Sequence, residues 1–266
     1  MKKISILLVA AAALCASSCS LFKLDNYNAP SETLYGKVVD ASGKPVLTDQ
    51  GSEGIRVRLT ETSWQGNVTP IDFYCRPDGT FNNTKVFEAD YNIRVDGPFI
   101  PLVRSTADGT LLADESVNTH VKGQTEVNFT VQPFLNVELV GIPQAAGGKI
   151  TAHVKVTRNV SEADFKNKIE PMGGYSDDFL NVTDIQLFVS YSSSVGYRAR
   201  DDRWSNAIDY PGASFEPLLG SEVSISSKGA IPSGRKVYVR AAARINYATE
   251  GNRRWNYSEP IEVYIP

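Results

Sequence analysis

The sequence predicts an all-β protein built from two antiparallel β-sandwiches in tandem. Three observations support this prediction: apolar and polar residues alternate along most of the chain, glycine-containing turns separate the alternating runs, and helical periodicity is confined to one short segment. Alternation with a period of two directs side chains to opposite faces of a strand, so that one face can be buried. The 266-residue chain is also long enough for two domains of ordinary size.

The N-terminal segment predicts export. Lys2 and Lys3 precede an apolar stretch at residues 4–14, and small residues lead to Cys19. This layout is typical of a cleaved signal peptide, and the stretch is too short to span a bilayer. The sequence CASSC also resembles a bacterial lipobox, which implies that Cys19 carries lipid, palmitate included. We expect a signal peptide at 1–18 and a lipidated tether at 19–32; the alternative is a secreted protein with an incidental cysteine.

Residues 33–132 are expected to form the first sandwich. Ile55, Val57 and Leu59 alternate with arginines, and the same pattern recurs at residues 91–95 and 127–131. Turns with Asp and Gly at 40–45 and 76–81 separate the runs, because glycine supplies the positive φ that tight turns require. The pattern is typical of an antiparallel sandwich.

Residues 133–266 are expected to form the second sandwich, after a boundary at Gln132-Pro133. Alternation continues at 135–139, 150–156, 185–189, 237–245 and 261–265. One helix is predicted after Ser161, since Ser161 and Asp164 have capping-box spacing and Phe165 and Ile169 share one side. Pro171 and the following glycines should end it, as an insertion packed on the sandwich.

Charge and composition exclude several classes of function. The chain has 27 Lys+Arg and 30 Asp+Glu, a net charge of −3, with no basic stripe. This argues against a nucleic-acid partner. Only two histidines occur, and neither has zinc-ligand spacing. The clusters Asp177-Asp178 and Asp201-Asp202 leave Ca²⁺ as an alternative, but no loop has EF-hand spacing, so we expect no metal and no cofactor. No G-x-S-x-G motif is present, and we expect a non-enzyme. Cys75 is expected to be a buried, inert thiol.

Aromatic residues in polar loops are the candidate ligand-binding sites. An exposed indole or phenol ring can stack on the C–H face of a sugar, and neighbouring charged groups can hold its hydroxyls. The preferred platform is Trp204 with Asp201, Asp202 and Arg203; Tyr210 and Trp255 come second. Trp64, in a polar loop of the first domain, is a third location. For each ring the alternative is a structural role in covering a sandwich end.

Longer stretches resemble known families. LYGKVVDASGKPV, the VRL strand and RPDGTF resemble the carboxypeptidase-regulatory-like, transthyretin-like sandwich, and KVYVRAAARIN with WNYSEPIEVYI is similar to late fibronectin type III strands. Together with CSLFKLDNYNAP, DGPFIP and DDFLNVTDIQLFVSYSSSVG, they resemble a family of two-domain surface lipoproteins of unknown function from saccharolytic Gram-negative bacteria. The resemblance implies a position beside starch-utilisation-type glycan importers.

These observations lead to one expected function and one alternative. We expect a non-catalytic lipoprotein of the outer membrane, held by lipid and displayed at the cell surface more readily than at the periplasmic face. It would bind or present a glycan alongside an importer complex. The alternative is a structural or assembly subunit of the envelope, a spacer or pilus-like protein, that contacts other proteins through sandwich edges. A long unprotected edge strand would favour this alternative.

Overall fold

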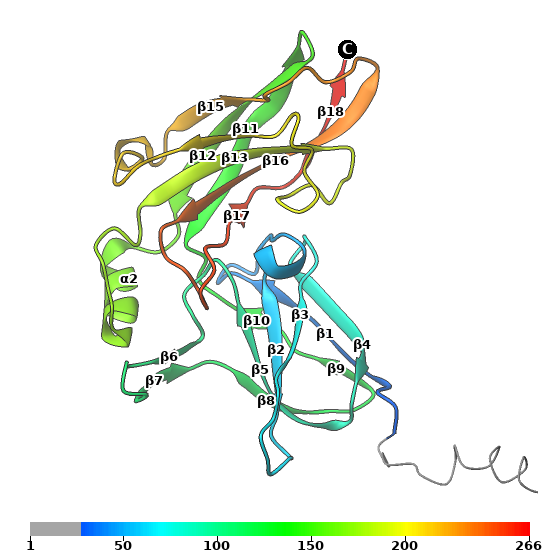
Figure 1. Ribbon diagram of the computed structural model, residues 1–266, viewed down its shortest axis with the longest axis vertical. Coiled ribbons are helices and arrows are strands. Elements are labelled where there is room, and N and C mark those ends of the chain that lie inside the picture. Colours follow the sequence, from blue (N-terminus) through cyan, green and yellow to red (C-terminus); the bar gives the residue numbers. More distant parts are fainter. Residues whose placement is uncertain (1–27) are drawn as a thin grey trace, which may run out of the picture.

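The structure is a computed structural model that describes residues 28–266. Figure 1 shows the first sandwich in the lower half of the view and the second above it, with the C-terminus at the far end. The predicted fold class is confirmed, because the described chain consists of β-sheets packed in tandem with one short α-helix. The expectations for the signal peptide and for Cys19 lie outside the described residues.

Two sheets form the first sandwich. One contains β1 (Glu32–Val39), β4 (Thr80–Val86), β9 (Gln124–Glu126) and β10 (Phe129–Thr130). The other contains β2 (Arg56–Glu61), β3 (Ile71–Tyr74), β5 (Ala89–Asp96) and β8 (Val117–Val121). A 3-10 turn, η1 (Gly51–Glu53), precedes β2, and a separate hairpin joins β6 (Val103–Ser105) to β7 (Leu111–Asp114).

The first sheet departs from the predicted antiparallel pairing. β1 pairs antiparallel with β4 but parallel with β9 and β10. Gly36 permits this arrangement, because a Cβ atom at this position would lie 1.7 Å from the carbonyl oxygen of Val127. The chain after β8 crosses to the other sheet and runs beside β1. This close approach of the two backbones is possible because Gly36 has no side chain.

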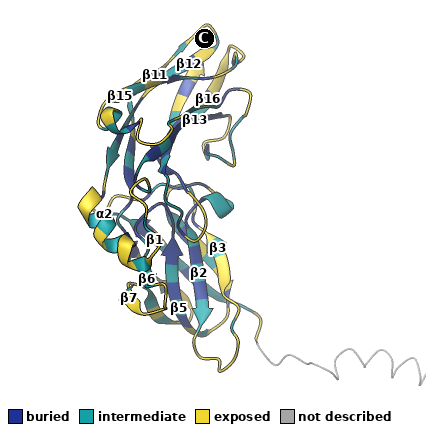
Figure 2. Ribbon diagram, turned by 60° about the vertical axis from the view of Figure 1, so that its left-hand side comes forward, coloured by how far each residue is buried: buried dark blue, intermediate teal, exposed yellow. Residues whose placement is uncertain are grey.

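The predicted alternation sets the core of the first sandwich. Val57 and Leu59 of β2 are buried, whereas Arg56 and Arg58 point to the outer face. Figure 2 shows the same contrast between buried and partly exposed positions along β2 and β5. Along β3 and the residue after it, burial increases from Ile71, which is 42% exposed, through the half-buried Phe73 to the buried Cys75.

Two further sheets form the second sandwich. One contains β11 (Leu135–Ala146), β12 (Lys149–Arg158) and β15 (Glu222–Ser226). The other contains β13 (Val182–Ser190), β14 (Asn206–Asp209), β16 (Arg235–Ile245), β17 (Asn256–Tyr257) and β18 (Ile261–Ile265). The 3-10 turn η3 (Glu216–Leu218) precedes β15. The boundary expected at Gln132-Pro133 falls between β10 and β11.

The predicted helix is present as α2 (Glu162–Ile169). The Ser161 hydroxyl accepts a hydrogen bond from the backbone N–H of Asp164, 3.1 Å away, which satisfies one free donor of the first turn. Phe165 and Ile169 are buried against the second core. The chain continues as η2 (Glu170–Met172). Figure 2 shows that the outer side of α2 is exposed, as expected for an insertion on the sandwich surface.

β11 is a long edge strand whose pairing is interrupted. It pairs with β12 alone, and the register shifts between Val140 and Gln144. Gly141 has a φ of 69°, and Pro143 has no N–H to offer a new partner. Bulges and prolines are common devices that prevent strand addition at sheet edges.

The two sandwiches meet in a buried junction. Phe188, Val195, Ala242, Trp255 and Tyr257 form a separate apolar cluster there. The buried Asp49 of the first sandwich accepts hydrogen bonds from the backbone N–H of Arg198 at 3.0 Å and from the Tyr257 hydroxyl at 3.3 Å. Glu250, in the loop after β16, forms ion pairs with Arg56 and Arg94 of the first sandwich. Apolar and polar contacts together fix how the sandwiches meet.

Candidate functional site

Trp204 does not offer the exposed ring that the sequence predicted. Its side chain belongs to the second hydrophobic core, and the residue is 3% exposed. The turn that carries it is fixed to β13, because the N–H of Asp201 donates to the carbonyl of Val189 at 2.8 Å. Tyr191 packs edge-on against the indole, with the ring centroids 5.1 Å apart. The prediction of an exposed stacking platform at Trp204 is therefore wrong.

The charged neighbours of Trp204 are engaged with one another. Asp201 accepts hydrogen bonds from Arg203 at 2.6 and 2.9 Å, and Asp202 accepts one from Arg200 at 2.6 Å. The pKa of Asp201 is lowered chiefly by its hydrogen bond with Arg203. The Arg203 guanidinium also lies over the indole, 4.8 Å from its centroid. The charged residues next to the buried indole are therefore explained by ion pairs that they form with one another in the same turn.

Tyr210 and Trp255 have structural environments as well. The Tyr210 ring is partly buried and packs edge-on against Phe215 at 4.8 Å, and burial raises its pKa. Trp255 is 4% exposed, stacks on Tyr197 at 4.8 Å and donates its indole N–H to Asp184 at 2.9 Å. The expectation that Trp255 presents its ring to solvent is wrong, because the ring lies in the junction cluster.

Trp64 is the tryptophan whose ring faces solvent. It lies in the loop between β2 and β3 and is 57% exposed. A Cβ atom at Gly66 would lie 2.8 Å from the indole Nε1, so the backbone of Gly66 supports one edge of the ring. The edge of the indole therefore lies next to its own loop, and more than half of the residue's surface is open to solvent.

A hollow of about 350 Å³ lies beside Trp64. Its apolar surface comes from Trp64, Val68 and Phe87, and Phe87 is 38% exposed. Its polar lining comes from Glu61, Asn67, Thr69 and Glu88. Aromatic surface beside planar carboxylate and amide groups can contact both the C–H face and the hydroxyls of a sugar ring.

Charged groups continue the rim of this Trp64 hollow. Glu88 accepts a hydrogen bond from the Lys122 ammonium at 2.7 Å, which lowers the pKa of Glu88 and raises that of Lys122. His120 lies on β8 and contacts Asp90 at 2.8 Å. A neighbouring hollow of about 400 Å³ shares Phe87 and Glu88 and reaches Asn28, where the described chain begins.

Cys75 and Asp184, two further groups with potential chemistry, have structural environments. Cys75 is buried, and burial raises its pKa to about 12, in agreement with the predicted inert thiol. Asp184 is buried and accepts hydrogen bonds from Arg244 and Trp255. Between residues 28 and 266, no group of three or more His, Cys, Asp or Glu is arranged to hold a metal ion. In the same range no helix has the length and hydropathy to cross a bilayer.

The fold and its exposed aromatic hollow define a tandem β-sandwich protein. Residues 32–132 match the family described as "Protein of unknown function (DUF3823) N-terminal domain". A crystal structure of a DUF3823 family protein from Bacteroides uniformis is 66% identical in sequence, with a TM-score of 0.86; the match covers 89% of this chain and 100% of that chain. The chain therefore belongs to the DUF3823 family.

Two more distant structures share the fold. A "putative carbohydrate binding protein" from Bacteroides uniformis is 19% identical with a TM-score of 0.63, and the match covers 89% of this chain and 100% of that chain. A DUF3823 family protein from Parabacteroides merdae is 18% identical with a TM-score of 0.57 and the same coverage. No curated protein matches this sequence.

Proposed function

We propose that this protein is a non-catalytic, lipid-anchored protein of the outer membrane that binds glycans at the Trp64 hollow. The observation that carries the proposal is the exposed indole of Trp64 beside a hollow lined by carboxylate, amide and hydroxyl groups. The indole edge lies close to Gly66, and the rest of the ring is open to a stacking ligand. Stacking supplies affinity, and Glu61, Asn67 and Glu88 can accept or donate hydrogen bonds to hydroxyls.

The similar proteins support this proposal in a limited way. A structure with the same fold is described as a "putative carbohydrate binding protein", and its identity to this chain is 19%. At that identity the fold is shared while a binding site need not be. The support for a saccharide ligand therefore comes mainly from the chemistry of the Trp64 hollow in this chain.

The proposed location at the outer membrane rests on the sequence around Cys19. Acyl chains at Cys19 would hold the protein at the outer membrane, since two or more chains give stable anchoring. Eight residues lie between Cys19 and Asn28, so the two are at most about 32 Å apart when the chain is fully extended. Ligand bound at the Trp64 hollow would then stay close to the membrane, where a starch-utilisation-type importer could receive it. Replacement of Cys19 by Ala should release the protein from the membrane fraction.

An assembly role has less support from the described edges. The longest edge strand, β11, carries the Gly141 bulge and Pro143, which hinder addition of a strand from another protein. A subunit that exchanges strands would retain interactions with envelope proteins after loss of the Trp64 ring. This provides a simple way to separate the two functions.

The Trp64→Ala variant tests the proposed function. The full-length protein should be retarded in native gels that contain a neutral polysaccharide, with amylopectin, galactomannan and xyloglucan as the first panel. Loss of one aromatic stack should weaken binding by about 1–2 kcal/mol, or roughly 5- to 30-fold. Trp64→Phe keeps an aromatic face and should retain part of the binding. Equal retardation of Trp64→Ala and the unmodified protein would remove the Trp64 hollow from the site.

A further inference from the structure

A groove crosses the junction between the sandwiches, away from the Trp64 hollow. It comprises a hollow of about 500 Å³ and a smaller cavity of about 60 Å³, and both are lined by Asp40 and Asn159. Asp40 belongs to the first sandwich and Asn159 to the second. None of the lining residues is shared with the Trp64 hollow. Domain junctions are frequent locations of ligand sites, and the larger volume lies in the range of small-molecule pockets.

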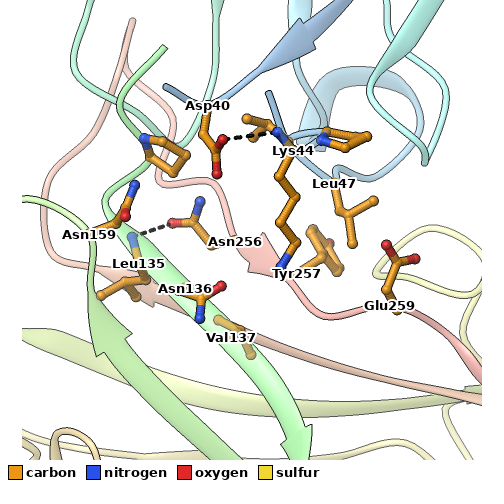
Figure 3. Close-up of a pocket in the computed structure, with 13 residues that line it drawn as sticks. Asp40, Lys44, Leu47, Leu135, Asn136, Val137, Asn159, Asn256, Tyr257 and Glu259 are labelled. Carbon is orange, nitrogen blue, oxygen red and sulfur yellow. Dashed lines mark hydrogen bonds between the residues drawn. The ribbon is translucent and has the colours of Figure 1, made fainter. Parts of the chain in front are cut away.

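Three polar groups in this junction groove have no partner among residues 28–266. The ammonium of Lys44 forms no ion pair or hydrogen bond, and the Asn159 side-chain amide forms none. Asp40 uses Oδ1 for three hydrogen bonds within its turn, which leaves Oδ2 free. Figure 3 shows Lys44 extending from the first sandwich toward the strand that carries Asn136 and Val137. All three groups line the smaller cavity, and Asp40 and Asn159 also line the larger hollow that continues from it.

The walls that hold these groups are fixed. Asp40 Oδ1 accepts the Lys44 backbone N–H at 3.0 Å. The buried Asn256 accepts the N–H of Leu135 at 3.2 Å and donates to the carbonyl of Pro98 at 3.0 Å, so it ties the two sandwiches together beneath the groove. A ligand would therefore meet a preformed surface and would not need to order it.

The charges of the junction groove balance. Lys168 pairs with Asp164 at 3.0 Å, and Arg104 pairs with Glu115 at 3.4 Å. Lys44 and Asp40 carry opposite charges on the same turn. With Glu259 included, three cations and three anions line the groove, so neither sign of charge predominates: Lys44, Arg104 and Lys168 against Asp40, Glu115 and Glu259. A neutral ligand with several hydroxyls fits, because each hydroxyl can donate to Asp40 Oδ2 and accept from Lys44 or Asn159.

We propose that the junction groove is a second site for a neutral saccharide, distinct from the Trp64 hollow. The choice of a saccharide as the ligand rests on the proposed function, but the residues of the junction groove and the experiment that tests it are separate. β1 connects the two regions, since Glu32 lines the hollow next to Trp64 and Asp40 follows the other end of the strand. Eight residues of strand span about 26 Å. One glycan chain of several residues that engages both sites would gain avidity from the linkage.

The test combines two exposed positions that lack partners. Lys44→Ala with Asn159→Ala removes two groups of the junction groove without breaking any hydrogen bond or ion pair of their side chains within residues 28–266. Lys149→Ala is the matched control, because Lys149 is exposed at the β11–β12 hairpin and forms no ion pair there. The full-length variants are compared in native gels containing amylopectin, galactomannan or xyloglucan, and thermal unfolding checks their folding.

We expect the double variant to bind the retarding polysaccharide about tenfold more weakly, as two lost hydrogen bonds to a ligand imply. The control should match the unmodified protein. Trp64→Ala should keep residual binding, and combining it with the double variant should abolish retardation. In a second measurement, the polysaccharide should slow acetylation of Lys44 but not of Lys149, as followed by peptide mass spectrometry.

The outcomes separate the two sites. If the double variant binds like the unmodified protein while Trp64→Ala is weakened, the junction site is excluded and the proposed function stands. If Trp64→Ala is unchanged while the double variant is weakened, the junction groove is the saccharide site and the Trp64 hollow is not. If no polysaccharide retards the protein or protects Lys44, both proposals are overturned.

Discussion

The Arg240 guanidinium lies over the ring of Tyr257, with its Cζ atom 4.4 Å from the ring centroid. Arg240 is 1% exposed and forms no ion pair within residues 28–266. It donates instead to carbonyl oxygens on both sides of the junction: Thr48 and Pro77 in the first sandwich, and Val195 and Ser258 in the second. Burial lowers its pKa. One side chain thus bonds both sandwiches at once.

Replacement of Arg240 by Met should destabilise the protein and loosen the junction. The substitution leaves several buried carbonyl groups without a donor and removes the cation over Tyr257, and we expect a loss of about 3 kcal/mol in the free energy of unfolding. Urea unfolding measures the loss, and small-angle scattering should detect a wider spread of domain arrangements. An Arg240→Met protein with unchanged stability would show that the carbonyl bonds contribute nothing net.

Tyr257→Phe is the matched control for the same junction. It keeps the ring beneath Arg240 and removes the hydroxyl that contacts Asp49 at 3.3 Å. The expected loss in the free energy of unfolding is about 1 kcal/mol, because one buried hydrogen bond is lost while the packing remains. A larger effect than that of Arg240→Met would identify the Tyr257–Asp49 contact as the main connection.

Trp204 and Trp64 should respond in opposite ways to truncation. Trp204→Ala removes a ring from the second core and should cost about 3–5 kcal/mol in the free energy of unfolding. Trp64→Ala removes an exposed ring and should change stability by less than about 0.5 kcal/mol. Thermal unfolding of the two variants measures the difference. A mild effect of Trp204→Ala would contradict the burial of its indole.

Sequence periodicity predicted the longer strands, such as β2, β5, β12, β13 and β16, and it predicted α2, because both signals are local, whereas short strands such as β6, β7 and β14 gave no such signal. The alternation around Val57 and the cap at Ser161 each depend on neighbours within a few residues. The environment of Trp204 was not predictable in this way. Its polar neighbours suggested exposure, but Asp201 and Arg203 satisfy each other inside one turn while the ring enters the core.

The junction between the sandwiches could not be predicted from local sequence patterns for a similar reason. Asp40 and Asn159 are 119 positions apart in the sequence, and only the packing of two sandwiches brings them to one groove. The parallel pairing of β1 with β9 likewise depends on a chain crossover. Gly36 carried a weak signal for it, since a glycine in a strand indicates a close backbone approach.

Cys75 should not react with alkylating reagents in the folded protein. Burial raises its pKa to about 12, and the residue is 3% exposed. At pH 8 roughly one thiol in ten thousand would be ionised, and the reagent would have little access. Iodoacetamide labelling followed by peptide mass spectrometry measures this. Unfolding in urea should restore labelling, whereas rapid labelling of the native protein would contradict the buried position.

The ion pair between Asp72 and Arg58 should stabilise the folded protein at neutral pH but not in acid. Arg58 donates to both carboxylate oxygens at 2.8 and 2.7 Å, and these hydrogen bonds are the main reason that the pKa of Asp72 is lowered. Because the folded pKa lies below the unfolded value of about 3.9, the contribution is present above pH 4 and is lost as the pH falls through the folded pKa. The side chain is 29% exposed, so solvent screening keeps the contribution near 1 kcal/mol.

Asp72→Asn should therefore be less stable than the unmodified protein at pH 7, by about 1 kcal/mol, and the difference should shrink as the pH falls through the lowered folded pKa of Asp72. Urea unfolding at pH 7 and in acid, below the folded pKa of Asp72, measures this difference in stability. Asp202→Asn is the matched control, because that side chain is 80% exposed in its pair with Arg200 and should have a smaller effect at pH 7. A difference for Asp72→Asn that persisted unchanged into acid would mean that packing or shape, and not the charge of Asp72, stabilises this outer face of the sheet.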